Sequence, residues 1–227
     1  AYTDSVNEPN PELGLRSIRF TLAYRDIFEQ QVQAILRAAA GRDSVGIMFP
    51  LISSVDDFLL ARQVVRDCLD RLKVDGLDHN DHPAIGMMVE LPSVVETMAE
   101  FAAEADFFTI GTNDLVQYML GVDRSNKRVA DYYRPEHPSV LRTLARMVNI
   151  AADHGKPISV CGEMGHDGAM IPFLLGIGIR RLSIDPQFMP AVHQCIAGLA
   201  IDPCRDHARM LLSAGSIDAV QKMLAEF

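Results

Sequence analysis

Three short polar clusters each follow an apolar run, and their side chains have the chemistry to hold a metal ion and to move a proton. Carboxylate oxygens suit Mg²⁺, which often takes one or two carboxylates together with substrate oxygens and water. A thiol has an ordinary pKa of about 8.5, so it is mostly protonated at neutral pH and can act as an acid. The clusters are Glu90, Asn113-Asp114 and Cys161-Gly162-Glu163.

The elements that must position these clusters can be predicted from the spacing of apolar residues. Short apolar runs predict buried strands, and amphipathic stretches with apolar residues three and four apart predict helices between them. Ser54 and Asp57 form a typical helix-start pair. Strands are expected at 45–49, 84–89, 107–110, 158–160 and 181–184. Helices are expected at 28–36, 55–72, from residue 92, at 113–121, 140–151 and 169–175, and after the last strand to Phe227.

This alternation predicts an α/β fold of parallel β/α units, in which functional groups collect at the carboxyl ends of the strands. A complete (β/α)8 TIM barrel needs eight strands and about 250 residues. Five strands, and a chain that starts at Ala1 without methionine, predict an incomplete barrel whose first strands are missing. Residues 1–227 are therefore expected to be one partial barrel domain.

Each cluster has an ordinary structural explanation when it is taken alone. A single Glu after a strand is usually a surface or helix-start charge, and Asn113-Asp114 alone would be a helix cap. A single Cys after an apolar strand usually belongs to the core. The recurrence of such groups at three consecutive strand ends favours a functional site, because surface residues have no reason to gather there.

Composition excludes several classes of protein. The 227 residues carry a net charge of −9, which argues against a general nucleic-acid binder because a phosphate backbone requires a basic surface. No apolar run reaches the length of a membrane span, and the first residues lack a signal-peptide pattern, so no membrane insertion is expected. Four cysteines without a Cys-x-x-Cys pair are typical of reduced thiols in the cytoplasm.

Several longer motifs resemble the phosphoenolpyruvate-binding barrel of bacterial enzyme I, the phosphoenolpyruvate-protein phosphotransferase. The resemblance runs from about residue 7 to about residue 200, and the motifs occur in the order of the family. Leu91-Pro92-Ser93 favours the nitrogen-related branch of the family over the sugar-transport branch. The motifs are Asn7-Glu-Pro-Asn-Pro-Glu-Leu-Gly-Leu-Arg16-Ser-Ile-Arg19, Met88-Val-Glu90-Leu-Pro92-Ser, Phe107-Phe-Thr-Ile-Gly-Thr-Asn113-Asp114-Leu, Val122-Asp-Arg124-Ser-Asn126 and Cys161-Gly-Glu163-Met.

The resemblance implies a role for each matching residue. Glu90 and Asp114 would bind Mg²⁺, and Cys161 would be the catalytic acid that protonates enolpyruvate. Four residues would contact the substrate, and the last of them would also support the thiol. These four are Arg16, Asn113, Arg124 and Glu163.

The resemblance also implies the reaction and the partners. The phosphoryl group of phosphoenolpyruvate would pass to a histidine on a separate domain and then to a phosphocarrier protein, leaving pyruvate. A homodimer in the cytoplasm is implied as well. None of the seven histidines lies in the acceptor motif, and further phosphate-binding arginines of the family belong to earlier strands, so this chain alone is expected to be inactive. His166, near Cys161, is interpreted as part of a surface loop.

Three alternatives stay open at the level of sequence. A phosphoenolpyruvate synthase or pyruvate phosphate dikinase would share the barrel and add a nucleotide-binding domain. A metal-dependent lyase or aldolase acting on pyruvate-like acids would share the carboxylates without a phosphohistidine domain. A non-catalytic dimerisation or regulatory module would lack magnesium-dependent binding of phosphoenolpyruvate.

Overall fold

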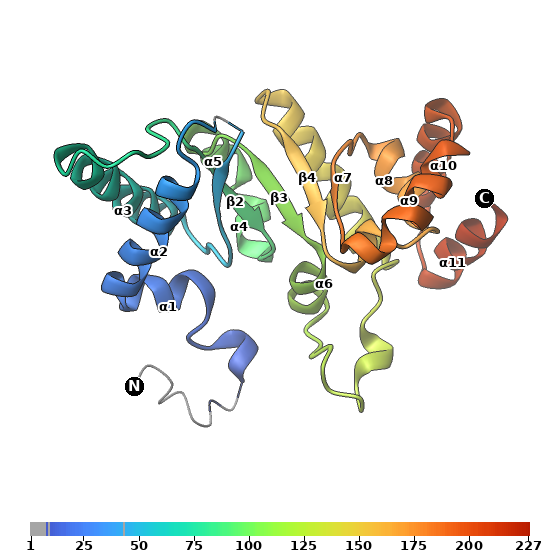
Figure 1. Cartoon of the computed structure of the whole chain (residues 1–227). Helices are drawn as coiled ribbons and strands as arrows, with labels where there is room; N and C mark the ends of the chain where they lie inside the picture. The colour runs from blue at the N-terminus through green and yellow to red at the C-terminus, as the bar shows by residue number, and fades with distance from the viewer. Residues whose placement is uncertain (1–7, 9, 43) are drawn as a thin grey trace. The chain divides into compact units, whose positions relative to one another are not determined.

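The structure is a computed structural model that describes residues 8, 10–42 and 44–227 (Figure 1). The chain divides into two compact units. Unit 1 comprises Ala1–Met88 with Glu104–Asp106, and unit 2 comprises Val89–Ala103 with Phe107–Phe227. Asn7, the first residue of the motif that ends at Arg19, lies outside the described residues.

Unit 1 contains helices together with two parallel strands. Strands β1 and β2 pair in parallel with Gly46 opposite Ala84, as the alternating pattern predicted. The side chain of Ser54 accepts a hydrogen bond of 3.1 Å from the backbone N–H of Asp57, which confirms the predicted helix start. The elements are η1 (Pro11–Leu13), α1 (Ser17–Ala23), α2 (Arg25–Ala38), β1 (Gly46–Phe49), α3 (Val55–Val74) and β2 (Ala84–Val89), whose last residue belongs to unit 2.

Aromatic side chains from three elements form the centre of unit 1. The ring of Phe49 on β1 lies 5.8 Å from that of Phe28 and 6.2 Å from that of Phe58, both edge to face. All three are at most 4% exposed. Outside this core, Glu29 on α2 pairs with Arg71 on α3 at 3.0 Å. In unit 1, residues of α2, β1 and α3 thus form one shared core.

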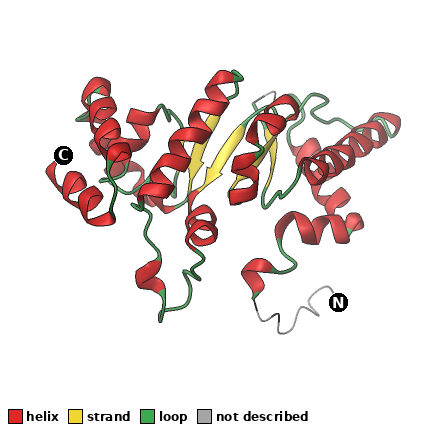
Figure 2. Cartoon of the chain, turned by 180° about the vertical axis from the view of Figure 1, so that it is seen from behind, coloured by secondary structure: helices red, strands yellow, loops and turns green. Residues whose placement is uncertain are grey.

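Unit 2 contains the other three strands, each separated from the next by helices (Figures 1 and 2). Strands β3, β4 and β5 pair in parallel, with Gly111 opposite Cys161 and Cys161 opposite Ser183. The first elements are α4 (Pro92–Glu96), α5 (Met98–Glu104), β3 (Phe108–Gly111), α6 (Thr112–Leu120), η2 (Ala130–Tyr132) and α7 (Pro138–Asp153). The later elements are β4 (Ile158–Cys161), η3 (Glu163–Gly165), α8 (Ile171–Ile177), β5 (Leu182–Ser183), η4 (Pro186–Phe188), α9 (Met189–Ala197), α10 (Ile201–Ser213) and α11 (Ile217–Glu226).

Helix packing in unit 2 depends on one close approach of backbones. A Cβ atom on Gly176 of α8 would lie 2.1 Å from the carbonyl oxygen of Cys204 on α10, so a larger residue would push these helices apart. Helix α7 buries Leu141, Leu144 and Met147 and lies against the β3–β4 pair in both views (Figures 1 and 2). In unit 2, α7 therefore lies against the β3–β4 pair, and α8 packs closely on α10.

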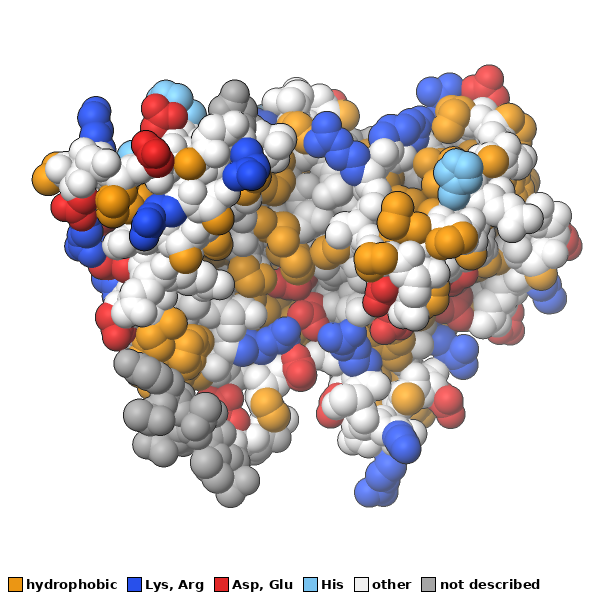
Figure 3. All heavy atoms as spheres, viewed as in Figure 1, with side chains coloured by type: hydrophobic (Ala, Val, Ile, Leu, Met, Phe, Trp, Pro, Cys, Tyr) orange, Lys and Arg blue, Asp and Glu red, His pale blue; other side chains and the backbone are white. Residues whose placement is uncertain are grey.

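The surface of the chain carries charges of both signs. On the face shown in Figure 3, Lys and Arg side chains are interspersed with Asp and Glu side chains. This mixture of charges, together with the net charge of −9, differs from the basic surface that a nucleic-acid binder requires. Among the described residues, no helix combines the length and the apolar character required to traverse a bilayer.

The predicted α/β class and the five strands are confirmed, with bounds shifted by a residue or two. Three details differ from the prediction. Helix α1 was not predicted, the helix expected from Pro92 is broken at Thr97 into α4 and α5, and α8 begins at Ile171 instead of Ala169. The five strands of the described chain are too few to close an eight-stranded barrel.

Candidate functional site

The carboxyl ends of β3 and β4 bring two of the predicted polar clusters into contact. Because Gly111 lies opposite Cys161, the residues just after these strands are neighbours. The Thr112 hydroxyl donates to the carbonyl oxygen of Cys161 at 2.9 Å, and the backbone N–H of Glu163 donates to Oδ1 of Asn113 at 3.0 Å. The start of α6 and the turn after β4 therefore form one hydrogen-bonded rim.

The turn between Cys161 and Glu163 requires glycine. Gly162 has φ of +100°, a region that L side chains rarely adopt. A Cβ atom at this position would lie 2.5 Å from Oγ1 of Thr112 and 2.8 Å from Oδ1 of Asn113. Both the backbone conformation and the close approach to α6 exclude a side chain, so the polar rim depends on this residue.

The Cys161 thiol lies within the electrostatic influence of two buried carboxylates. Glu90 and Asp114 are 3% and 7% exposed. The pKa of Cys161 is raised above its ordinary value by burial first, and the charges of Glu90 and Asp114 add to the increase, whereas a hydrogen bond with Thr109 lowers it. The thiol is 3.4 Å from the carbonyl oxygen of Ile110, to which it donates. Cys161 therefore stays protonated at neutral pH, as a general acid must.

Arg124 joins the rim from the loop of residues 121–137, just after α6. Its guanidinium Nη2 lies 3.6 Å from Oδ1 of Asp114. The backbone N–H of Arg124 donates to Oε1 of Gln117 at 3.0 Å, and Gln117 is 4% exposed. Sequence patterns did not predict a role for Gln117, because a single amide on an apolar helix face has no characteristic spacing.

Tyr133 is a further residue of the site that the sequence did not reveal. Burial raises its pKa to about 12, the charges of Glu163 and Asp114 act in the same direction, and Arg124 opposes them. Tyr133 borders a cavity of about 340 Å³ beside the rim. The other residues around the cavity are Thr112, Val116, Pro135, Glu163, Met164, His166 and Asp167.

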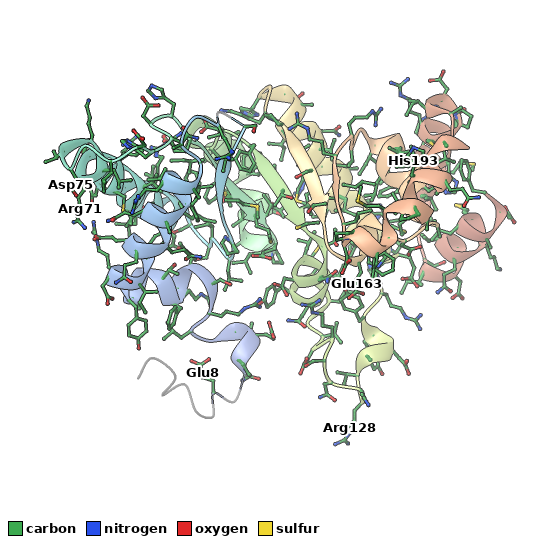
Figure 4. All side chains as sticks on the ribbon, in the orientation of Figure 1. Glu8, Arg71, Asp75, Arg128, Glu163 and His193 are labelled. Atoms are coloured by element: carbon green, nitrogen blue, oxygen red, sulfur yellow. The ribbon has the colours of Figure 1, made fainter. Side chains whose placement is uncertain are left out.

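The remaining predicted residues have separate surroundings. Arg16 belongs to unit 1, where it precedes α1 and pairs with Glu12. Glu163 is exposed and lies beside Asn113 of α6, to which its backbone N–H donates; its side chain is labelled in Figure 4, and its charge acts on Tyr133. The ring of His166 stacks on Phe188 with 3.9 Å between centroids.

The donor chemistry of the rim fits Mg²⁺. Two buried carboxylates near one thiol provide hard oxygen ligands, and burial of like charges is favourable only when a cation compensates them. In the part of the chain that the structure describes, no three His, Cys, Asp or Glu side chains form a metal cluster. A site with two carboxylates would leave the other coordination positions to substrate oxygens and water, which is the common arrangement for Mg²⁺.

The fold and the rim define a β/α protein with a polar, partly buried site at the carboxyl ends of its strands. Residues 1–201 match the PEP-binding domain of PEP-utilising enzymes, and the chain belongs to this family. It is 38% identical to the phosphoenolpyruvate-protein phosphotransferase of Mycoplasma capricolum over all of its 227 residues, which are 39% of that protein. It is 37% identical to multiphosphoryl transfer protein 1 of Escherichia coli, of which it covers 27%.

Solved structures show likeness in fold alone. A citrate lyase from Burkholderia xenovorans matches with a TM-score of 0.54 and 17% identity, over 87% of this chain and 66% of that one. An aldolase/citrate lyase family protein from Burkholderia cenocepacia matches with a TM-score of 0.50 and 18% identity, over 74% and 68%. These matches agree with an incomplete barrel of the (β/α)8 type. The chain spans less than half the length of the two curated relatives.

Proposed function

We propose that this chain is the phosphoenolpyruvate-binding catalytic part of a phosphoenolpyruvate-protein phosphotransferase. The observation that carries the proposal is the Cys161 thiol, whose pKa is raised by burial and by the charges of Glu90 and Asp114. A protonated acid beside two buried carboxylates is what the conversion of an enol phosphate to pyruvate requires. The names of the relatives support the same reaction.

Each residue of the site has a separate task in this proposal. Glu90 and Asp114 would hold Mg²⁺, which would supply positive charge to neutralise the phosphate. Arg124 would bind an anionic group of the substrate, because a planar guanidinium matches phosphate and carboxylate. The resemblance to the family implies the same role for Arg16. Asn113 uses its oxygen to accept from Glu163, which leaves its amide N–H groups to donate to the substrate.

The proton and the phosphoryl group take a balanced path. The bond between phosphorus and the enol oxygen breaks, and a bond forms between phosphorus and a histidine nitrogen of a separate domain. The enolate left behind takes the proton of Cys161 on its methylene carbon and becomes pyruvate, and the thiolate regains a proton from water. The phosphohistidine then passes its phosphoryl group to a phosphocarrier protein.

Two further parts of the proposal concern the whole protein. All four cysteines are free thiols in the structure, which supports a reducing compartment such as the cytoplasm. A homodimer is expected from the resemblance to enzyme I, and sedimentation equilibrium of the chain measures it directly. Assignment to the sugar or the nitrogen-related branch depends on the phosphocarrier protein that accepts the phosphoryl group.

Calorimetry with phosphoenolpyruvate tests the proposal on this chain. We expect binding that depends on Mg²⁺ and that weakens by at least about 10- to 100-fold in Glu90→Ala, because loss of a residue that only orients a metal ligand already costs that much. Glu100→Ala removes the same charge from the exposed surface of α5 and serves as the matched control. Binding that is the same with and without Mg²⁺, or equal in the two variants, would contradict the proposed metal site.

A further inference from the structure

The Arg124–Asp114 pair has an unusual combination of burial and distance. The Asp114 side chain is 9% exposed and the Arg124 side chain is 35% exposed. The 3.6 Å between guanidinium Nη2 and carboxylate Oδ1 is within the range of an ion pair and beyond the range of a good hydrogen bond. Arg124 therefore compensates the charge of Asp114 at a distance longer than that of a good hydrogen bond between these two atoms.

The backbone of Arg124 is fixed while its side chain reaches inward from the edge of the site. Its N–H donates to the buried Gln117 side chain at 3.0 Å. The adjacent turn is also held, because Oδ1 of Asp123 accepts from the N–H of Ser125 at 2.9 Å. The guanidinium can thus change partners by rotation about its own side-chain bonds, without movement of the loop.

Asp114 is one of two buried carboxylates whose charges reach the Cys161 thiol. Buried like charges are costly unless a cation lies close to them. Because Arg124 pairs with the Asp114 carboxylate and the proposed metal ion would bind the same carboxylate, the two cations compete for it. The inference drawn from this competition rests on the proposed function of the rim.

We propose that Arg124 is an exchangeable counter-ion of the metal site. Arg124 holds Asp114 while the site lacks a divalent cation, and releases it when the cation binds. The released guanidinium then turns to the phosphate or carboxylate of the substrate. One arginine thereby opposes binding of the metal alone and favours binding of the substrate, which makes the two binding events cooperative.

The competition predicts opposite effects of one substitution on two ligands. Arg124→Gln removes the competitor, so Mn²⁺ alone, a probe with hard-cation chemistry, should bind about five-fold more tightly, the factor that corresponds to ~1 kcal/mol for a partly exposed ion pair. Phosphoenolpyruvate in the presence of Mn²⁺ should bind more weakly than to the wild-type chain, by about 10-fold or more, because its guanidinium contact is lost.

A charge-matched control separates local competition from the general field. Arg128→Gln changes the net charge by the same amount in the same loop, and Arg128 points away from the rest of unit 2 (Figure 4). It should leave both affinities within about two-fold of wild type. Arg124→Lys keeps the charge but lacks the planar fork, so its affinity for Mn²⁺ alone should stay near that of wild type while its affinity for phosphoenolpyruvate falls.

The experiment measures Mn²⁺ binding to the 227-residue chain by electron paramagnetic resonance and ligand binding by calorimetry. Tighter Mn²⁺ binding in Arg124→Gln than in Arg128→Gln supports the inference. Equal Mn²⁺ affinities in these two variants overturn the proposed exchange. If Asp114→Asn abolishes Mn²⁺ binding in the same experiment, the proposed metal site still stands. Absence of Mn²⁺ binding in the wild-type chain overturns both the metal site and the exchange.

Discussion

Strand β1 of unit 1 and strands β3 and β4 of unit 2 lead into segments of different character at their carboxyl ends. In unit 1, β1 continues into Leu51 and Ile52, which are 1% and 0% exposed, so its carboxyl end is sealed by hydrocarbon. In unit 2, β3 leads to Asp114 and β4 ends at Cys161, and the rim carries charge and hydrogen bonds. The segment after β1 thus contributes to the apolar core, whereas the segments after β3 and β4 carry polar and ionisable side chains.

The difference matters because burial has opposite costs at the two ends. Apolar side chains gain roughly 25 cal/mol for each Å² removed from water, whereas a buried carboxylate loses hydration and needs a compensating partner. A site that buries Glu90 and Asp114 is therefore expected to lower stability while it provides reactivity. Substitutions at the two ends should separate the loss of stability from the loss of reactivity.

Cys161→Ala should affect the chemistry most, by about 10²- to 10⁴-fold in the rate of pyruvate formation, the range for loss of a general acid. Binding of phosphoenolpyruvate should be unchanged, because the thiol is not expected to hold the phosphate. The assay measures deuterium incorporation into pyruvate in heavy water by the full-length protein. Normal incorporation by the variant would remove Cys161 from the proton path.

Ile52→Ala in unit 1 should reduce the free energy of unfolding by about 2–5 kcal/mol, because a fully buried aliphatic side chain is replaced by a cavity. Mn²⁺ binding at temperatures where the variant remains folded should be that of wild type. Val74→Ala is the control, since Val74 is 86% exposed and should change stability by less than about 0.5 kcal/mol. Urea denaturation measures both variants.

Gly162→Ala should cost about 1–3 kcal/mol of stability from backbone strain, and it should also disturb the rim by contact with Thr112 and Asn113. Gly155→Ala has a similar left-handed conformation, with φ of +63° and no atom within 4 Å of the added carbon. Gly155→Ala should therefore reduce stability without reducing Mn²⁺ affinity. Equal losses of Mn²⁺ affinity in the two variants would show that the close contact at the rim is unimportant.

The smallest effect concerns alkaline pH. Because the pKa of Cys161 is raised in the folded state, its contribution to stability is fully present below the ordinary thiol pKa of about 8.5 and is lost as pH rises through the folded value. Wild type should therefore lose stability above pH ~8.5 more steeply than Cys161→Ser, by at most about 1.4 kcal/mol per pH unit. Urea denaturation from about pH 7 to about pH 10 measures the difference across the thiol range, and parallel curves would contradict it.

Sequence patterns predicted the strands well because their apolar runs are short and bounded by turn-forming residues. The bounds of β2, Ala84–Val89, were predicted without error, and so was the Ser54 cap. Helix α1 was missed because it begins at Ser17, whose φ is +52°, and lacks the usual starting signals. The break at Thr97 is a local backbone change that periodicity does not encode.

The sequence predicted the residues of the proposed site that follow strands, and it missed the residues that contact them from elsewhere in the chain. Glu90, Asp114 and Cys161 lie at or just after the carboxyl ends of strands, and neighbouring parallel strands have their carboxyl ends at the same edge of the sheet. Gln117 and Tyr133 act through burial and through distances across a loop, which no spacing within the sequence reports. The expected support of the thiol by Glu163 remains a prediction, since the described hydrogen bond of this residue comes from its backbone N–H to Asn113.

The two hydrogen bonds from the turn after β4 to α6 have a mechanical consequence. Thr112 holds the carbonyl oxygen of Cys161, and Asn113 holds the backbone nitrogen of Glu163, so the turn is fastened to the helix at two points on either side of a glycine. The backbone that carries the thiol is therefore joined directly to the helix that carries Asp114. Rotation of the Arg124 side chain can rearrange the charges around this junction while the proton donor keeps its place.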